Sequence, residues 1–253
     1  MILLLAGTKD ARELGAFLQK SGCEVLATAV SDYGGSLINS AGLDNFLVKR
    51  LSREEMAALI KEKNISAVID ATHPYAEIVS RQTIALTEEL GIPYLRFERP
   101  KTPLPDSELL YRVKDVDEAA RCAVSLGRRI FLTTGSKNLQ DFLAYRKEGI
   151  TFIARVLPDP AVLQKCFDLG LSPKEIVAMQ GPFSYELNLA LYRQYQAEVI
   201  VSKESGKVGG ADEKIKTALE LHIPLVLIER PKVIYPAAAG NPEEVIAWLK
   251  KER

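Results

Sequence analysis

The stretch DATHPYA at residues 70–76 places three side chains that can do chemistry, Thr72, His73 and Tyr75, directly after an apolar run. Because a proline disfavours helical backbone for the residue before it, we expect the imidazole of His73 to project from an extended turn. Pro74 itself suits the first turn of a following helix. Such an imidazole can transfer a proton, bind a metal ion or shape a pocket. The chain has only two histidines and no acidic pair at ligand spacing, so we expect no metal site.

The stretch LLLAGTKDAR at residues 3–12 passes from an apolar run into a helix start through Gly7. A glycine turn before a helix presents backbone N–H groups to a phosphate. Thr8 adds a hydrogen-bonding hydroxyl there, and Arg12 adds a positive charge. The complete Gly-x-Gly-x-x-Gly pattern is absent. Nucleotide binding is therefore one interpretation of this loop, and a plain acidic helix cap is the other.

The stretch TAVSDYGGS at residues 28–36 follows the next apolar run and contains Ser31 and Asp32. In a dinucleotide-binding fold an acidic residue at this place often binds the ribose hydroxyls of NAD. The alternative is a turn built from the aspartate and the two glycines. No lysine or arginine lies within the loop to meet a 2′-phosphate, which favours NADH over NADPH.

Three loops of the second half repeat the arrangement of an apolar run, a small-residue turn and a helix start. They read TTGSKNL at 133–139, QGPFSYELN at 180–188 and VSKESGKVGGADEK at 201–214. The third lacks the spacing of a Walker loop but resembles an anion-binding nest with two lysines, Lys203 and Lys207. A solvated loop is the alternative. In the second loop, Ser184 is expected to be a helix N-cap.

Short apolar runs that alternate with amphipathic stretches must position these loops. The runs are Ile2–Leu5, Glu24–Val30, Asn45–Val48, Ala67–Ile69 and Tyr94–Phe97, and then Arg129–Thr133, Thr151–Val156, Glu175–Met179, Glu198–Val201 and Pro224–Ile228. Helices are expected near 10–21, 53–63, 76–90, Val116–Leu126, 137–147, 159–169, 184–195, 211–221 and Glu243–Lys250. The runs are apolar at successive positions, as parallel strands covered on both faces require. The proline-rich residues 99–108 predict a linker.

The two halves also echo each other. LGIPYLRFERP at 90–100 and LHIPLVLIERP at 221–231 each close a series of five runs. We therefore predict two Rossmann-like α/β domains of related topology, each a doubly wound parallel sheet, with a ligand cleft between them. The expected boundaries are 1–104 for the cofactor domain and 105–253 for the substrate domain. Because the terminal strands are repeated, the terminal strand–helix tails are hypothesised to pack across the two halves.

Composition restricts the class of protein. The 253 residues contain 33 basic and 33 acidic side chains, so nothing in the net charge favours nucleic acid or a membrane surface as a partner. The three cysteines are far apart and lack a Cys-x-x-Cys motif, which fits a reducing cytoplasm. The apolar start MILLLAG is expected to be a buried strand. The oligomeric state is not predicted.

The loops LLLAGTKDAR, DATHPYA, TTGSKNL, GPFSYELN and SKESGKVGGADEK occur in the order seen in precorrin-6A reductases, and the chain resembles this family over essentially its whole length. The specific motifs are DATHPYA and K-E-S-G-x-x-G-G-x-x-E-K. The family's first loop is commonly Gly-Gly-Thr-x-Glu-Ala-Arg. Here Ala6 replaces its first glycine and Asp10 its glutamate, which keeps the charge.

The resemblance implies a cytoplasmic oxidoreductase that uses NADH or NADPH to reduce the precorrin-6A macrocycle to precorrin-6B in cobalamin biosynthesis. Relatives in the anaerobic pathway act on the cobalt-containing substrate and are associated with NADH, which agrees with the Asp32 loop. Carboxylates on the tetrapyrrole need cationic and N–H donors, and hydride addition benefits from a proton donor. We favour pocket shaping for His73.

The expected roles follow these requirements. Proton-donor candidates are His73, Tyr75 and Lys203. Cofactor-binding candidates are Gly7, Thr8, Arg12, Ser31, Asp32 and Thr72. Substrate-binding candidates are Thr134, Gly135, Ser136, Lys137, Ser184, Ser205, Lys207, Gly209 and Gly210.

Two other functions fit the same pattern. One is a reductase of a different substrate; it would not use the short-chain reductase mechanism, because no tyrosine has a lysine four residues later. The other is a non-catalytic dinucleotide sensor, which would leave the polar loops of the second half unexplained. Consumption of NADH or NADPH with precorrin-6A or its cobalt form distinguishes these functions.

Overall fold

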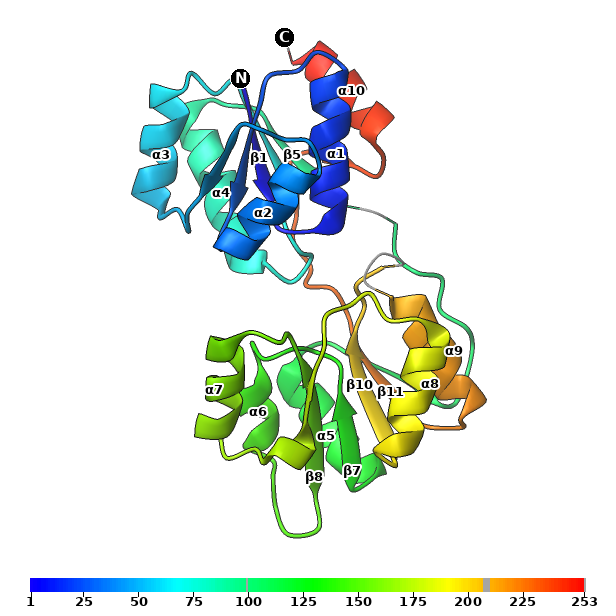
Figure 1. Cartoon of the computed structure of the whole chain (residues 1–253). Helices are drawn as coiled ribbons and strands as arrows, with labels where there is room; N and C mark the ends of the chain where they lie inside the picture. The colour runs from blue at the N-terminus through cyan, green and yellow to red at the C-terminus, as the bar shows by residue number, and fades with distance from the viewer. Residues whose placement is uncertain (99, 207–209, 253) are drawn as a thin grey trace. The chain divides into compact units, whose positions relative to one another are not determined.

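The computed structural model describes residues 1–98, 100–206 and 210–252. The chain forms two compact units (Figure 1). Unit 1 comprises Met1–Pro100 with Pro231–Arg253, and unit 2 comprises Lys101–Arg230. The boundaries expected from the sequence therefore need correction: residues 101–104 belong to unit 2, and residues 231–253 belong to unit 1.

Unit 1 is built on a parallel sheet of six strands, sheet A, in the order β12-β5-β4-β1-β2-β3. The strands are β1 (Ile2–Ala6), β2 (Val25–Ala29), β3 (Phe46–Val48), β4 (Ala67–Ala71), β5 (Tyr94–Phe97) and β12 (Ala238–Ala239). The helices are α1 (Lys9–Lys20), α2 (Asp32–Ser40), α3 (Arg53–Glu62), α4 (Glu77–Leu90) and α10 (Pro242–Lys251).

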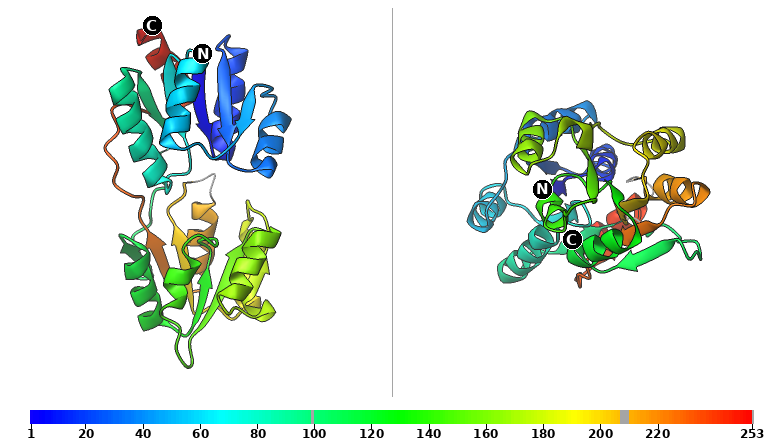
Figure 2. Two further views of the ribbon diagram at one scale, coloured as in Figure 1. Left: turned by 90° about the vertical axis from the view of Figure 1, so that its left-hand side faces the viewer. Right: turned by 90° about the horizontal axis from the view of Figure 1, so that it is seen from below.

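Alternate residues of β1 show why both faces of sheet A are covered. Leu4 packs in a cluster with residues of α1, α2 and α10, whereas Leu3 and Leu5 pack in a second cluster with residues of α3 and α4. Because successive side chains of a strand point to opposite faces, an unbroken apolar run needs a helical layer on each side. The views of Figure 2 show these layers.

Unit 2 contains sheet B, also parallel and six-stranded, in the order β6-β11-β10-β7-β8-β9. Its strands are β6 (Leu110–Val113), β7 (Arg129–Leu132), β8 (Thr151–Val156), β9 (Ile176–Ala178), β10 (Val199–Lys203) and β11 (Leu225–Ile228). The helices are α5 (Val116–Leu126), α6 (Leu139–Leu143), α7 (Pro160–Asp168), α8 (Tyr185–Gln194) and α9 (Ala211–Glu220), with a short 3₁₀ turn at Pro173–Glu175.

The two sheets have the same strand order when each series of five consecutive strands is numbered from 1 to 5. Five consecutive strands are arranged as 3-2-1-4-5 in each sheet, and the sixth position is filled from elsewhere in the chain. In sheet A, β12, which follows the last strand of the second series, pairs with β5. In sheet B, β6, which follows the last strand of the first series, pairs with β11. These pairings agree with the hypothesis that the terminal tails are exchanged.

Three local expectations were wrong. Residues 32–40 form helix α2 rather than a loop or turn, capped by Ser31, whose hydroxyl accepts from the amide of Gly34. Pro74 lies in a turn before α4, and the helix begins only at Glu77. The helix expected over 137–147 is shorter, since α6 spans only Leu139–Leu143.

Candidate functional site

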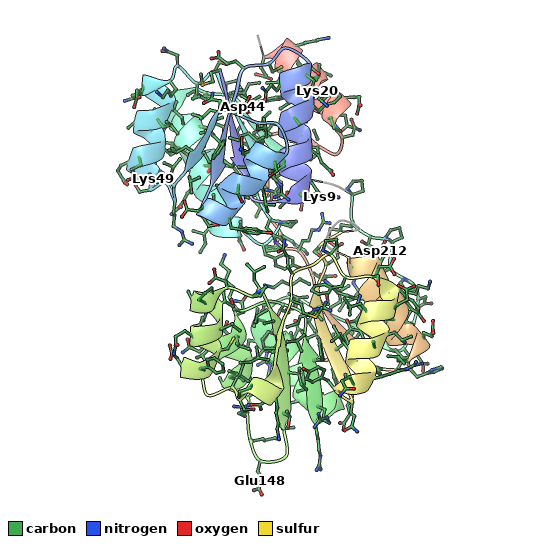
Figure 3. All side chains as sticks on the ribbon, viewed as in Figure 1. Lys9, Lys20, Asp44, Lys49, Glu148 and Asp212 are labelled. Atoms are coloured by element: carbon green, nitrogen blue, oxygen red, sulfur yellow. The ribbon has the colours of Figure 1, made fainter. Side chains whose placement is uncertain are left out.

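The carboxyl edge of each sheet is where ligands bind in doubly wound folds, next to the point where the strand order reverses. In sheet A that point lies between β1 and β4, and in sheet B between β7 and β10. Lys9 and Lys49 mark the carboxyl edge of sheet A in Figure 3, and Lys20 and Asp44 mark the opposite edge. All loops singled out in the sequence follow the carboxyl ends of strands.

Gly7 and Thr8 meet the end of β4 at the reversal point of sheet A. A side chain added at Gly7 would lie 3.6 Å from the backbone of Thr72 and His73. The hydroxyl of Thr8 donates to the carbonyl of Ala71 at 3.3 Å and caps α1 by accepting from the amide of Ala11 at 3.1 Å. This edge therefore presents an exposed glycine backbone and the N-terminus of a helix, which suits a phosphate of a dinucleotide.

A buried network behind this edge starts at Asp70, near the end of β4, which is fully buried. Its Oδ1 accepts from the amide of Thr72 at 3.0 Å and from the Thr72 hydroxyl at 2.6 Å. Its Oδ2 accepts from the hydroxyls of Ser80 at 2.6 Å and Tyr94 at 2.7 Å. Arg96 of β5, also buried, donates to Oδ1 at 3.0 Å.

The charges of this network are set by burial and by the ion pair. Burial opposes ionisation of Asp70, but the Arg96 charge and the hydroxyls of Ser80, Thr72 and Tyr94 outweigh it, so the pKa of this carboxyl lies below its ordinary value of 3.8. Burial and the Asp70 charge raise the pKa of Tyr94 far above its ordinary value of 10.0. Tyr94 is therefore a hydrogen-bond donor here and not a proton donor.

His73 and Tyr75 lie beyond Thr72 in the turn before α4. His73 is exposed, and its Nδ1 accepts from the amide of Tyr75 at 3.3 Å. That hydrogen bond favours the tautomer with the proton on Nε2. The two rings are 5.6 Å apart and tilted by 41°. The structure thus brings Thr72, His73 and Tyr75 together with Gly7 and Thr8.

The remaining cofactor candidates lie on neighbouring helix starts. Arg12 is half-buried in the first turns of α1. Ser31 and Asp32 are exposed at the start of α2, directly after β2, the strand beside β1. Ser31 caps that helix, so its hydroxyl already has a structural role.

In unit 2 the loop after β7 meets the end of β10. Lys203 Nζ donates to Asn138 Oδ1 at 3.1 Å and to the carbonyl of Thr134 at 3.4 Å. Gly135 between them has a φ of +74°, a conformation that glycine adopts without strain. The carbonyl of Ser136 accepts from Lys165 Nζ at 2.9 Å, and Lys137 is exposed.

The environment of Lys203 suits a group that gives up a proton. Burial, and then the positive charge of Lys137, lower the pKa of Lys203 below its ordinary value of 10.5. An ammonium group whose pKa is lowered toward neutrality is a better general acid. Lys203 and Lys137 also place two ammonium groups close enough to affect each other, an arrangement that can bind carboxylates.

The other substrate candidates lie on two helix starts. Ser184 caps α8, and its hydroxyl accepts from the amide of Leu187 at 3.2 Å, which confirms the expected N-cap. Gly210 precedes α9 with a φ of +65°. The hydroxyls of Ser205 and Thr134 are buried without a hydrogen-bond partner among the described residues. Lys207 and Gly209 lie outside the described residues.

Sequence reasoning missed a second buried cluster, in unit 2. The guanidinium of Arg155 on β8 donates to Asn188 Oδ1 at 2.8 Å and stacks 3.7 Å from the centre of the Phe183 ring. Lys214 of α9 is also buried, and burial, then the charge of Arg155, lower its pKa to about 7 against an opposing effect of Asp212. The sequence signal was a charged residue inside an apolar run, as in the strands that contain Asp70 and Arg96.

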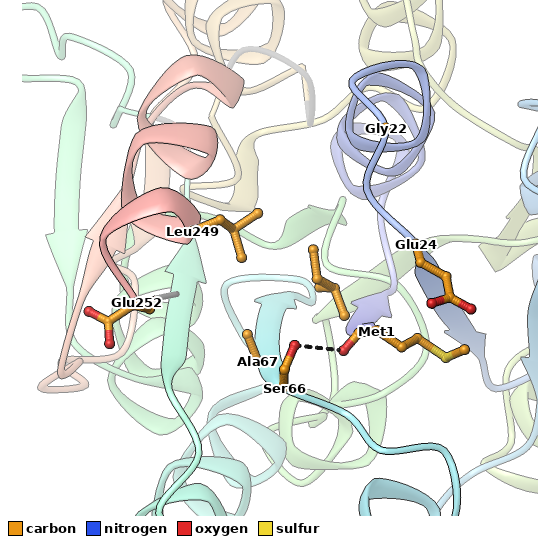
Figure 4. A pocket seen from close by; sticks show the side chains of 8 residues that line it. Met1, Gly22, Glu24, Ser66, Ala67, Leu249 and Glu252 are labelled. Carbon is orange, nitrogen blue, oxygen red and sulfur yellow. Dashed lines mark hydrogen bonds between the residues drawn. The ribbon is translucent and has the colours of Figure 1, made fainter.

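A cavity of about 420 Å³ lies at the opposite, amino edge of sheet A, lined by Met1, Ile2, Gly22, Glu24, Ser66, Ala67, Leu249 and Glu252. The hydroxyl of Ser66 donates to the carbonyl of Met1 at 3.2 Å there (Figure 4). None of the candidate residues lines this cavity. The described residues contain no cluster of three metal-ligating side chains. No helix within them is long and apolar enough to cross a membrane.

Comparison with known proteins gives a consistent result. The sequence matches the family described as precorrin-6x reductase CbiJ/CobK over residues 1–250. The cobalt-precorrin-6A reductase of Priestia megaterium is 41% identical over 251 residues, 98% of each chain. The enzyme of the same name from Methanocaldococcus jannaschii is 39% identical over 253 residues, 98% of this chain and 97% of the relative. The precorrin-6A reductase of Mycobacterium tuberculosis is 30% identical over 249 residues, which are 96% of this chain and 93% of the relative.

A solved structure of CobK precorrin-6A reductase has the same fold. It aligns with a TM-score of 0.80 at 24% identity and covers 99% of this chain and 96% of that chain. The predicted fold class, with two parallel-sheet α/β domains, is therefore confirmed.

Proposed function

The chain belongs to the precorrin-6x reductase family CbiJ/CobK, and from that membership we propose that it reduces cobalt-precorrin-6A with NADH in cobalamin biosynthesis. Relatives in this family are oxidoreductases that act on a CH–CH bond of the macrocycle and use a nicotinamide cofactor. The observation that carries the proposal is 41% identity over 98% of both chains to a cobalt-precorrin-6A reductase.

The cobalt-containing substrate is favoured by the pattern of identities. Six relatives named for the cobalt form are 31% to 41% identical to this chain. Two relatives named for precorrin-6A without cobalt are 30% and 29% identical. Cobalt in this proposal belongs to the substrate and needs no ligands from the chain.

We propose that unit 1 binds the cofactor. Gly7 leaves the backbone open for a pyrophosphate at the start of α1, and Thr8 and Arg12 add a hydroxyl and a positive charge. Ser31 and Asp32 lie after the neighbouring strand, where the adenosine ribose binds in this fold. Thr72 completes the set next to Gly7. Ser31–Ser36 contains no basic residue for a 2′-phosphate, which supports NADH over NADPH.

We propose that unit 2 binds the carboxylates of the tetrapyrrole. Positive charge comes from Lys137 and Lys203, and hydroxyls or turn amides come from neighbouring residues. The complete set is Thr134, Gly135, Ser136, Lys137, Ser184, Lys203, Ser205, Lys207, Gly209 and Gly210.

The bound nicotinamide supplies a hydride, and one proton balances its addition to the macrocycle. Lys203 is the proton donor that the environment favours, because burial lowers the pKa of its ammonium group. Deprotonated Nζ then retains the Asn138 side chain as a hydrogen-bonding neighbour. His73 and Tyr75 shape the cofactor-side pocket, with the His73 proton held at Nε2.

Oxidation of NADH, followed by its absorbance, tests the activity with cobalt-precorrin-6A and with precorrin-6A. The proposal expects turnover that depends on substrate and a higher kcat/KM for NADH than for NADPH. Binding of NADH without oxidation would favour a sensor, and no binding of cofactor or substrate would refute both functions.

A lysine variant tests the assignment of the substrate loop. Lys203→Ala is expected to weaken tetrapyrrole binding more than NADH binding and to lower kcat, because it removes a positive charge and a proton donor. Lys216→Ala, which removes an exposed lysine of α9, is the control. A change in NADH affinity alone would show that the loop was assigned to the wrong ligand.

A histidine variant tests the role of the imidazole. His73→Ala is expected to lower the rate without changing the shape of its pH profile, because we assign His73 to positioning. A shifted profile would assign proton transfer to the imidazole instead.

A further inference from the structure

Because the two sheets have the same topology, residues at equivalent strand positions of units 1 and 2 can be compared. The strands β4 and β5 of sheet A occupy the positions of β10 and β11 in sheet B. In the paired repeat, Tyr94 aligns with Leu225 and Arg96 aligns with Leu227. Asp70 pairs with Arg96 between β4 and β5, and Ser202 pairs with Leu227 between β10 and β11. Asp70 and Ser202 therefore occupy equivalent positions in the two sheets.

The comparison shows that these three positions can be filled without charges, since the buried ion pair of unit 2 lies further along, between Glu204 and Arg230. In unit 2, Ser202, Leu225 and Leu227 are all fully buried at these positions. In unit 1 the same places hold a buried carboxylate, a buried tyrosine and a buried guanidinium. Burying an ion pair costs desolvation that apolar side chains avoid, so stability alone does not explain the ion pair of unit 1.

The hydrogen bonds of the pair divide into two directions. Asp70 Oδ2 is bound by Ser80 of α4 and Tyr94 of β5, inside the layer that covers the sheet. Asp70 Oδ1 is bound by Arg96 and by both the amide and the hydroxyl of Thr72, beyond the carboxyl end of β4.

Arg96 adds two further hydrogen bonds to Thr72, on the Oδ1 side of Asp70. Its NH1 donates to the Thr72 hydroxyl at 3.2 Å and its NH2 donates to the Thr72 carbonyl at 3.0 Å. The guanidinium also lies 5.4 Å from the centre of the Tyr235 ring. Every polar group of Thr72 is thus held by the ion pair, directly beside Gly7 and before His73.

We propose that Asp70 and Arg96 are positioning residues that hold the Thr72–His73 backbone in the geometry in which unit 1 receives the nicotinamide dinucleotide. The proposal rests on the proposed function, because it takes the Gly7–Thr72 edge to be the cofactor site. Asp70 and Arg96 are buried and act through Thr72, without contact to the cofactor.

A variant that copies unit 2 tests this assignment. Asp70→Ser, Tyr94→Leu and Arg96→Leu together install the residues found at Ser202, Leu225 and Leu227, so the buried carboxylate and the buried guanidinium are removed together. The variant is expected to remain folded by circular dichroism. The Kd for NADH, measured by its fluorescence, is expected to rise at least tenfold, with a smaller change in the KM for the tetrapyrrole. An unchanged Kd for NADH in the folded variant would overturn the proposal.

A matched pair of single variants applies if the triple variant does not fold. Thr72→Val and Ser80→Ala each remove one hydroxyl that donates to Asp70 at 2.6 Å, the first on the Oδ1 side and the second on the Oδ2 side. Because Thr72 is itself a cofactor-binding candidate, the readout is hydrogen exchange of the Thr72 amide, which only Thr72→Val is expected to accelerate. Equal effects of the two variants on that exchange would show a general structural role and refute positioning.

Hydrogen exchange separates this proposal from the proposed function. The amide of Thr72 donates to Asp70 Oδ1, so in the triple variant its exchange is expected to accelerate at least tenfold relative to wild type. Suppose that the Thr72 amide exchanges faster in the triple variant but that the wild-type protein does not bind NADH. The cofactor assignment would then be refuted, and the positioning of the Thr72–His73 backbone by Asp70 and Arg96 would still stand. Unchanged exchange would refute the positioning role, whatever the ligand.

Discussion

Replacement of Lys214 by methionine should stabilise the protein in a way that depends on pH. Lys214 is buried on α9, near Arg155 of β8. It lies two residues after Asp212, which Figure 3 labels. Burial is the main reason why its pKa falls from 10.5 to about 7. At about 1.4 kcal/mol per pH unit, this shift corresponds to about 5 kcal/mol of unfavourable free energy for the charged form in the folded state.

The direction of the pH dependence follows from which state holds the proton. Between pH 7 and pH 10.5 the unfolded chain keeps the Lys214 proton and the folded chain has lost it, so unfolding takes up a proton and the free energy of unfolding rises with pH. Below pH 7 both states hold the proton, and the full penalty applies. The advantage of Lys214→Met should therefore be about 3 kcal/mol larger at pH 6 than at pH 9.

Urea unfolding of wild type and variant at pH 6 and pH 9 measures this difference. A methionine also loses the contacts of the ammonium group, so the net gain at pH 6 is expected to be about 1–4 kcal/mol. Lys216→Met, on the exposed face of the same helix, is the control and should show no such pH-dependent difference. A difference between wild type and Lys214→Met that is the same at both pH values would refute the reasoning.

Three further predictions concern stability. Gly35→Ala should cost about 1–3 kcal/mol in urea unfolding, because a Cβ would lie 2.5 Å from Val48 Cγ2; a neutral effect would mean that β3 moves freely. Asp159→Ala should cost about 1 kcal/mol, since its Oδ1 accepts from two amides at the start of α7; the Tm measures this, with exposed Asp168→Ala as control. Asp70→Asn should cost about 3–5 kcal/mol at pH 7, because it removes the carboxylate that pairs with the buried Arg96 guanidinium. The ionised carboxyl stabilises above its ordinary pKa of 3.8 and loses this effect as pH falls through its lower folded value, so the difference from wild type should shrink on acidification.

Much of the candidate site could be predicted from the sequence, because parallel α/β sheets place their ligand-binding loops at a repeated position. Each strand ends where a helix begins, and polar residues at those junctions meet at one edge of the sheet. The segments that contain Gly7 and Thr72 were therefore assigned to one edge, and they lie so close that a Cβ at Gly7 would be 3.6 Å from Thr72 Cα. The specific motifs also indicated the family, which the comparisons confirm.

The sequence did not predict helix α2, because packing rather than local helix propensity stabilises it. Asp32–Ser40 contains two glycines and lacks a strong helical pattern, yet it forms α2 because Ser31 caps it and Gly35 fits closely against Val48. Glycine costs about 1 kcal/mol in a helix interior, so only the close contact with β3 explains its presence there.

The sequence by itself determined the order of the five strands in each series and of the helices other than α2, the sheet class, the polar loops and the family, because these depend on patterns within a few neighbouring residues. It did not predict β6, β12 or α2. Only the tertiary structure decided that β12 completes sheet A and that Asp70 and Arg96 form a buried pair behind Thr72. The physical reason is that partner choice between segments far apart in the chain depends on register and burial. A charged residue inside an apolar run shows that a partner is needed, but its identity becomes known only when the strands are paired.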